Sequence, residues 1–407
     1  MFKNYFCFLA IVILASCNKS DFTKEETFIS VFESTATLTR QTYDDGVILL
    51  TKEGSSSLVY RMDKDGRKIW KKDISYLFSS HANLSFTTVT SNRDGGCLLG
   101  GNFNVDSATY YRSVLFIFKL DQNGQVVFEI NTDTMVTAGV QSFEDIIQAK
   151  DGNWVGIVNR NSESRIIRIN KQGQIIANSN IDYSEFWKKI IQTSDEGYAA
   201  MGYFNSNYII EKFDSSFINE WSKIIFPIST NSASYVTNVA TDFIEMPNTD
   251  LLICGHSSAL NKTSVKDFDF FITKLNASGD SLLSNFFSNP YNDYSKNLII
   301  TRDNKILITG TESSLDNNLI YSYSYSRADE NNFYRINSSS RCFVIKLNTD
   351  LSQIWSKSYG NGFGSDGLIT VERPDGSYLI CGNQVSYGNK NALLLFTIKA
   401  LKNGNLP

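Results

Sequence analysis

Residues 93–101 read RDGGCLLGG and residues 117–128 read IFKLDQNGQVVF, and this pair of stretches decides the fold. The first stretch is an acidic, glycine-containing turn followed by an apolar run. The second is an apolar run, then a Lys or Arg, an apolar residue, an Asp or Asn and a further turn. Gly and Asn tolerate the positive φ of tight turns, so each stretch predicts strands joined by a short turn.

Both stretches repeat along the whole chain in strict alternation. Copies of the first are YDDGVILLT (43–51), RDGGCLLGG (93–101), KDGNWVGIV (150–158), SDEGYAAMG (194–202), PNTDLLICG (247–255), RDNKILITG (302–310) and PDGSYLICG (374–382). Copies of the second are VYRMDKDGRKIW (59–70), IFKLDQNGQVVF (117–128), IIRINKQGQIIA (166–177), IEKFDSSFINEW (210–221), ITKLNASGDSLL (272–283), VIKLNTDLSQIW (344–355) and a worn FTIKALKNGNLP (396–407). The steps of 44 to 72 residues predict seven repeated units; the alternative, seven unrelated hairpins, is strongly disfavoured because no copy is skipped.

Each unit contains four segments with the pattern of strands. In the third unit these segments read SFEDIIQA, WVGIVN, RIIRIN and QIIANSN. Four antiparallel strands per repeat are typical of a propeller blade, and closing the blades into a ring hides the two raw ends of the array. The 407 residues therefore predict an all-β chain with a single seven-bladed β-propeller, not two or three domains.

The seventh unit ends after about three strands, at Pro407. An alternating apolar run, TFISVFE at 27–33, precedes the first unit. We expect this N-terminal segment to supply the missing strand of the last blade and so to close the ring.

This repeat resembles the WD-repeat and quinoprotein-like propeller superfamilies. The resemblance rests on the glycine before the second-strand run and on a D-x-x-G-x-x-x-W motif, whose Trp position holds Trp70, Trp221 and Trp355. Phe128, Ala177 and Leu283 replace that Trp in other units. The resemblance covers nearly all of the chain but only at the level of the fold, and it implies that the Trp side chains pack between blades.

The N-terminal segment MFKNYFCFLAIVILASC (1–17) has a Lys near its start, an apolar run and a small-residue end, which is typical of a signal peptide. Its last four residues, Leu14 to Cys17, resemble a bacterial lipobox. That resemblance implies removal of the preceding peptide and lipidation of Cys17, including palmitate; the alternative is a plain secretory signal that contains a cysteine. Several acyl chains give a stable membrane anchor.

These features divide the chain into a signal peptide (1–16), a lipid-anchored linker (17–26) and the propeller (27–407). Asn18 is not the Asp that often retains lipoproteins in the inner membrane, so the resemblance points to an outer-membrane lipoprotein. Whether it faces the periplasm or the cell surface stays open. We expect no other segment to span the membrane, because no second apolar run of about 18 residues occurs.

Composition narrows the chemistry. The net charge is −4, which disfavours nucleic acid as a partner. The chain has only two histidines, His81 and His256, so we expect no catalytic triad, no metal site and no cofactor. Four cysteines lie in apolar, strand-like runs without a CxxC spacing and are expected to be buried, their pairing being left open: Cys97, Cys254, Cys342 and Cys381.

Loop length distinguishes the two faces of the predicted ring, because only the second-to-third and fourth-to-first connections vary and both emerge on one side. The longest insertion, 312–341, carries Tyr321, Tyr323, Tyr325, Arg327, Phe333, Tyr334 and Arg335. Other loops on that face are expected to hold Tyr110, Tyr111, Arg112, His256, Lys266, Tyr291 and Tyr294. Tyr and Arg are typical binding anchors, so this face is the predicted binding surface; the alternative is a hairpin that covers its own blade.

Two functions follow. The favoured prediction is a monomeric, non-catalytic scaffold that binds a protein or a glycan, with no catalytic residue and no cofactor. The alternative is a polysaccharide hydrolase or lyase that uses the central channel. Asp145, Asp242 and Asp293 could face that channel, but we interpret them as solvated or turn residues.

Overall fold

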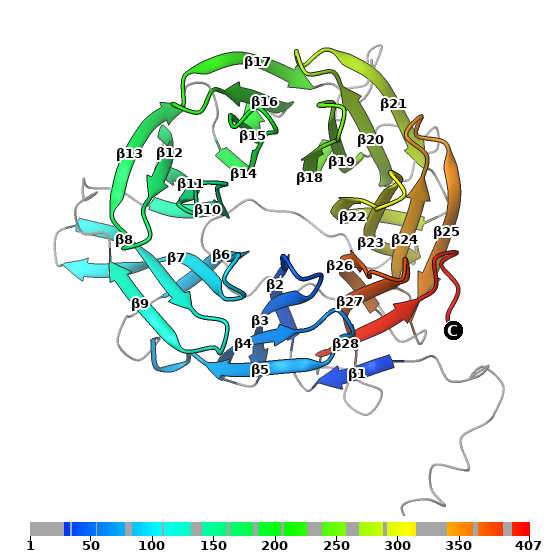
Figure 1. The fold of residues 1–407 in the computed structure, drawn as a ribbon, viewed down its shortest axis with the longest axis horizontal. Helices are drawn as coiled ribbons and strands as arrows, with labels where there is room; N and C mark the ends of the chain where they lie inside the picture. Colours follow the sequence, from blue (N-terminus) through cyan, green and yellow to red (C-terminus); the bar gives the residue numbers. More distant parts are fainter. Residues whose placement is uncertain are drawn as a thin grey trace, which may run out of the picture.

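The structure is a computed structural model that describes residues 28–32, 35–53, 55–77, 84–107, 110–131, 141–160, 163–181, 186–204, 207–225, 238–257, 268–287, 291–314, 340–360, 365–385 and 393–407. These residues form seven four-stranded antiparallel sheets that stand like blades around a central axis (Figure 1). The prediction of an all-β, seven-bladed propeller is confirmed.

Blades are numbered here in chain order, and their strands run from the axis outward. Blade 1 contains β2 (Thr35–Gln41), β3 (Val47–Glu53), β4 (Ser56–Met62) and β5 (Lys68–Asp73). Blade 2 contains β6 (Ser85–Ser91), β7 (Cys97–Ser107), β8 (Tyr110–Leu120) and β9 (Val126–Asn131). Blade 3 contains β10 (Gln141–Gln148), β11 (Trp154–Arg160), β12 (Glu163–Ile169) and β13 (Ile175–Ile181). Blade 4 contains β14 (Phe186–Gln192), β15 (Tyr198–Phe204), β16 (Asn207–Phe213) and β17 (Asn219–Ile225).

The remaining three blades complete the ring. Blade 5 contains β18 (Asn238–Glu245), β19 (Leu251–Ser257), β20 (Asp269–Leu275) and β21 (Ser281–Phe287). Blade 6 contains β22 (Tyr291–Ile300), β23 (Ile306–Ser314), β24 (Arg341–Leu347) and β25 (Gln353–Tyr359). Blade 7 contains β26 (Ser365–Glu372), β27 (Tyr378–Val385), β28 (Leu393–Ala400) and, at its outer edge, β1 (Phe28–Phe32).

The apolar core is divided into seven layers, one between each pair of neighbouring blades. Successive side chains of a strand point to opposite sheet faces, so Ile48 and Leu50 pack toward blade 2 while Val47 and Leu49 pack toward blade 7. Because both faces are covered, the second and third strands need continuous apolar runs. This is why the repeated runs of the sequence are apolar throughout.

Every blade has the same tight turn twice, after its first and its third strand. In blade 1, the Thr42 N–H donates to the Gly46 carbonyl (2.9 Å) and the Asp45 N–H donates to the Thr42 carbonyl (3.1 Å). The fourth turn residue has a positive φ, as in three-residue hairpin loops with an αL position. We call the side of the ring on which these turns lie the tight-turn face. The longer connections leave from strand ends on the opposite face, as predicted.

Two bulky residues occupy positive-φ turn positions that usually favour glycine. They are Phe217 (φ 67°) and Leu351 (φ 64°), both buried. Phe217 packs against the Tyr198 ring at 5.3 Å, and Leu351 belongs to the apolar layer between blades 5 and 6. Burial of these side chains offsets the backbone strain, so the turn works without glycine.

Glycines of the second strand allow the two inner strands to approach closely. A Cβ atom at Gly310 would overlap the Tyr294 carbonyl oxygen, and one at Gly382 would overlap the Asp366 carbonyl oxygen. At these two positions within the second strand, glycine is therefore a steric requirement of the blade.

Blades 7 and 1 meet to close the ring. The Asn383 side chain accepts a hydrogen bond from the Ala36 N–H (2.9 Å) and donates one to the Ala36 carbonyl (3.1 Å). An apolar layer joins the same two blades. The structure also pairs β1 antiparallel with β28, next to the last repeat (Figure 1). That the ring depends on this strand stays a prediction.

Outer-strand tryptophans pack between blades, as predicted. The Trp70 indole N–H donates to the Gln122 carbonyl of blade 2 (2.8 Å), and the Trp221 indole N–H donates to the Ala277 carbonyl of blade 5 (3.1 Å). The four cysteines in the described strands are buried and free, as expected of small apolar residues: Cys97, Cys254, Cys342 and Cys381.

Candidate functional site

The innermost strand of every blade has one register irregularity at the same place. These bulges lie between Ala36/Leu38, Phe86/Thr88, Phe143/Asp145, Trp187/Lys189, Ala240/Asp242, Ser295/Asn297 and Gly367/Ile369. A bulge re-aims the side chains beside it. In blades 3, 4, 5 and 6 the residue just after the bulge is polar or charged, and it is directed at the neighbouring blade.

These residues, with an arginine of blade 1, form a network that we call the central network: Arg40, Asp145, Lys189, Asp242 and Asn297. Arg40 of β2 donates to the Val89 carbonyl of β6 (3.2 Å) and to Asp145 of β10 (2.5 Å). It thus ties together three blades. The second Asp145 oxygen accepts a hydrogen bond from the Ile190 N–H of β14 (3.2 Å).

The same arrangement continues around the ring. Lys189 of β14 forms an ion pair with Asp242 of β18, and Asp242 accepts a hydrogen bond from the Leu298 N–H of β22 (2.8 Å). Asn297 of β22 then accepts a hydrogen bond from the Thr370 N–H of β26 (3.2 Å). A side chain of the central network therefore bonds the backbone of the next blade at four interfaces.

The two cations and two anions of the central network neutralise one another. Asp145 and Asp242 side chains are only 7% and 5% exposed. Burial and the charge of Arg40 lower the pKa of Lys189 to about 8, against the attraction of Asp145. The ammonium group therefore stays charged at neutral pH and keeps its pairing with Asp242. Mutually satisfied, buried charges of this kind hold blades in register.

The two repeated stretches of the sequence meet on the tight-turn face. In six blades the Lys or Arg near the end of the third strand pairs with an acidic residue of the first turn, as in Lys119–Asp94 (2.9 Å) and Lys212–Asp195 (2.8 Å). The other pairs of this kind are Arg61–Asp44, Lys274–Asp250, Lys346–Asp303 and Lys399–Asp375. In blade 3, Arg168 instead donates to the Tyr198 hydroxyl of blade 4 (2.9 Å). The sequence analysis used these residues only as markers of the repeat and did not predict that they pair. The signal was that a stretch with an acidic turn is always followed by a stretch with a Lys or Arg.

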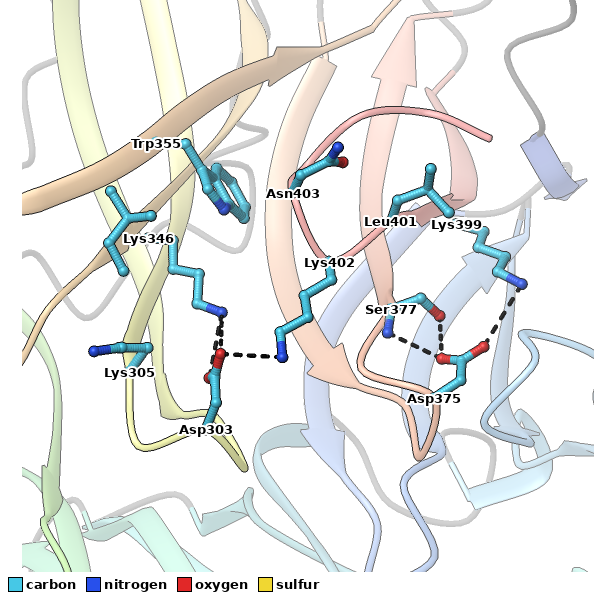
Figure 2. Close-up of a pocket in the computed structure, with 11 residues that line it drawn as sticks. Asp303, Lys305, Lys346, Trp355, Asp375, Ser377, Lys399, Leu401, Lys402 and Asn403 are labelled. Carbon is cyan, nitrogen blue, oxygen red and sulfur yellow. Dashed lines mark hydrogen bonds and ion pairs between the residues drawn. The ribbon is translucent and has the colours of Figure 1, made fainter.

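Between blades 6 and 7, the tight-turn face is hollowed by a pocket of about 730 Å³ (Figure 2). Four lysines and two aspartates line it, which leaves two positive charges in excess. Its wall also includes the indole ring of Trp355 and the half-exposed side chains of Ile354 and Leu401. We call this the blade 6–7 pocket.

Asp303 is the electrostatic centre of the blade 6–7 pocket. The ammonium groups of Lys346 and Lys402 lie 3.0 and 3.5 Å from its carboxylate, as Figure 2 shows. Burial alone would raise the pKa of Asp303, but hydrogen bonds from Thr301 and Lys346 and the charges of both lysines lower it to about 2. The carboxylate is therefore ionised at any physiological pH.

Most predicted binding residues lie outside the described residues. These are Cys17, Lys266 and the aromatic insertion with Tyr321, Tyr323, Tyr325, Arg327, Phe333, Tyr334 and Arg335. Tyr110, Tyr111 and Arg112 begin β8, where their backbones pair with the end of β7. The predicted binding surface thus stays a prediction.

Several residues expected in loops belong to strands instead. His256 lies in β19 and is 1% exposed, with the rings of Phe268 and Tyr294 at 5.5 and 5.1 Å. Tyr294 and Tyr291 likewise belong to β22. The loop assignment was wrong because the strands extend further than their apolar runs.

The interpretation of three aspartates as solvated or turn residues was also wrong. Asp145, Asp242 and Asp293 lie in inner strands and are 5%, 4% and 1% exposed. Asp145 and Asp242 can be buried because side chains and backbone groups of neighbouring blades bind their carboxylates. These partners lie tens of residues away, so the local sequence does not reveal them.

No protein-family model matches the chain, and no curated protein matches its sequence. Among solved structures, the WD40 domain of Neurospora crassa Pan2 has a TM-score of 0.52 at 8% identity, covering 90% of this chain and 89% of that one. A streptogramin B lyase has a TM-score of 0.50 at 13% identity, covering 92% and 97%. Virginiamycin B lyase from Staphylococcus aureus has a TM-score of 0.50 at 11% identity, covering 90% and 95%.

At these identities the likeness concerns the fold alone, and it confirms the resemblance to WD-repeat propellers at that level. In the described part of the chain, no group of three or more His, Cys, Asp or Glu side chains is placed to hold a metal ion. The same residues include no helix with the length and apolarity of a membrane span.

Proposed function

We propose that this chain is a lipid-anchored cell-envelope β-propeller that binds a protein or glycan partner without catalysing a reaction. The observation that carries the proposal is the self-neutralised central network. In many ring-shaped folds the centre is a natural ligand site, but here Arg40, Asp145, Lys189 and Asp242 engage one another. Their charges stiffen the ring, which suits a scaffold that presents its longer connections to a partner.

The lipid anchor rests on the sequence of residues 1–17 and the cysteine at its end. Replacing Cys17→Ser should abolish incorporation of labelled palmitate and should move the protein from the membrane fraction to the soluble fraction. Labelling of the Cys17→Ser variant at the wild-type level would overturn the anchor.

Partner binding is tested at the aromatic insertion. Replacing Tyr323, Tyr325 and Tyr334 together by Ala should abolish recovery of the partner on a glycan array or in a cross-linked envelope pull-down. A matched variant of the tight-turn face, Tyr43→Ala, alters an exposed tyrosine on the opposite side and should leave recovery unchanged. Equal recovery with the triple variant would overturn the binding surface.

One observation favours a second candidate, a polysaccharide hydrolase or lyase. Carboxylates and cations do lie together near the axis of the ring, as such chemistry requires. Release of reducing ends or of unsaturated products from acidic polysaccharides by the wild type, lost in Asp145→Asn and Asp242→Asn, would support this enzyme and overturn the scaffold.

A further inference from the structure

The interface between blades 6 and 7 differs from two otherwise matching interfaces. Trp70, Trp221 and Trp355 occupy the same position of the outer strand in blades 1, 4 and 6. Trp70 and Trp221 donate their indole N–H groups to the outer turn of the next blade. Among the described side-chain hydrogen bonds, none joins the Trp355 indole to the turn 401–405, whose Gly404 carbonyl accepts from the Tyr359 hydroxyl instead (2.6 Å). Figure 2 shows the Trp355 ring at the edge of the pocket. The interface that lacks this bond is the one that contains the pocket.

Two of the four lysines that line the pocket have long ion pairs. The Lys399 ammonium group lies 3.9 Å from Asp375, whereas the matching pairs of blades 2 and 4 lie at 2.9 and 2.8 Å. Lys402, whose side chain is 63% exposed, reaches Asp303 at 3.5 Å. The Lys402 ammonium group can therefore turn to another anion at small cost.

From these observations we propose that the blade 6–7 pocket binds an anionic sugar, a hexose ring that carries a phosphate or a carboxylate. The volume of about 730 Å³ falls in the range of small-molecule sites. This site lies on the tight-turn face, opposite the predicted binding surface. It is therefore independent of the proposed scaffold function.

Each part of the ligand has a counterpart in the pocket. The anionic group is bound by Lys402, whose ammonium group lies on the Trp355 side of the pocket and forms charge-assisted hydrogen bonds with its oxygens (Figure 2). The sugar ring lies against the indole of Trp355, whose N–H donates to a ring hydroxyl; such an amphipathic side chain suits a ligand with one apolar face and a polar edge. Binding also neutralises the two positive charges that the lining leaves over.

The first test is calorimetry on the full-length protein in detergent with glucose 6-phosphate, glucose and inorganic phosphate. We expect saturable binding of glucose 6-phosphate and at least tenfold weaker binding of the other two compounds. Equal affinity for glucose would overturn the anionic part of the proposal. Equal affinity for inorganic phosphate would overturn the sugar part.

Two matched pairs of variants assign the binding to this pocket. Lys402→Ala should weaken glucose 6-phosphate binding about tenfold, the loss typical of one charge-assisted hydrogen bond. Lys171→Ala changes the equivalent, exposed turn residue of blade 3 and should bind as the wild type does. Equal losses in both variants, or none in Lys402→Ala, would overturn the site.

Trp355→Phe keeps an aromatic ring and removes the indole N–H, so it should weaken binding several-fold, whereas Trp221→Phe should not. In a spectrum of the five indole N–H groups, glucose 6-phosphate should shift the signal that Trp355→Phe removes. A shift confined to any other indole signal would contradict the proposal. Because neither result depends on Cys17 or on the aromatic insertion, failure here would leave the scaffold function standing.

Discussion

The central network and the blade 6–7 pocket both bring lysines next to aspartates, but they differ in how fully the charges are used. At the centre, Asp145 and Asp242 are nearly buried, and each accepts hydrogen bonds from both a cation and a backbone N–H of another blade. In the pocket, Lys402 is exposed and Lys399 is only loosely paired. Charged groups whose hydrogen bonds are all made within the protein stabilise the fold, whereas exposed and loosely paired charged groups can bind a ligand.

Both charged regions exist only if the ring of blades is closed. Opening the ring should therefore have the largest effect on stability. Deleting residues 18–33 removes β1 from the edge of blade 7. We expect the single cooperative unfolding transition to be lost, because the loss in free energy of unfolding is comparable with the whole stability of a domain, about 5–15 kcal/mol. Urea unfolding followed by near-ultraviolet circular dichroism measures it. A cooperative transition at the wild-type midpoint would rule out closure by this strand.

The second effect separates the two charged regions by stability. Asp242→Ala leaves Lys189 buried without its partner and should lower the free energy of unfolding by about 3–5 kcal/mol. Lys402→Ala removes an exposed side chain and should change it by less than about 0.5 kcal/mol. Urea denaturation of both variants measures the difference. Similar values would mean that the centre is no more structural than the pocket.

Acid should act on the buried His256 of blade 5 before it acts on the pocket. Burial, followed by the charges of Lys296 and Lys188, lowers the pKa of His256 to about 3. Between pH 6.5 and 3 the unfolded chain binds a proton that the folded chain does not. Stability that is complete above pH 6.5 is therefore lost as the pH falls, by on the order of 4 kcal/mol at pH 3.

Chemical unfolding at several pH values measures this loss, and His256→Gln should reduce its slope. Asp303 provides the contrast, since its pKa of about 2 means that its contribution is complete above about pH 4 and is lost only as the pH falls further. An unchanged slope between pH 6.5 and 4 in His256→Gln would show that another group titrates.

The fold could be predicted because its information is local. Each apolar run and each tight turn, such as 93–101, specifies a strand and its end without reference to the rest of the chain. Counting these stretches then gives the number of blades. Trp70 and Trp221 also pack where their repeat position predicts.

The sites could not be predicted in the same way, because they depend on which side chains the closed ring brings together. Arg40 and Asp145 are 105 positions apart and meet only through the bulges of the inner strands. The features that distinguish the blade 6–7 pocket are equally small, such as the long ion pairs of Lys399 and Lys402. Composition and spacing carry no signal for differences of that size.

The central claim is that the central network stabilises the ring and that the blade 6–7 pocket binds the ligand. Single substitutions that change the structure little test it most directly. The measurement is the affinity for glucose 6-phosphate, by calorimetry, in the wild type, Asp242→Asn and Lys402→Ala. Asp242→Asn removes a central charge but keeps the shape and an oxygen that accepts the Leu298 N–H. We predict wild-type affinity in Asp242→Asn and an about tenfold loss in Lys402→Ala. The reverse pattern would place the ligand at the centre of the ring and contradict the account.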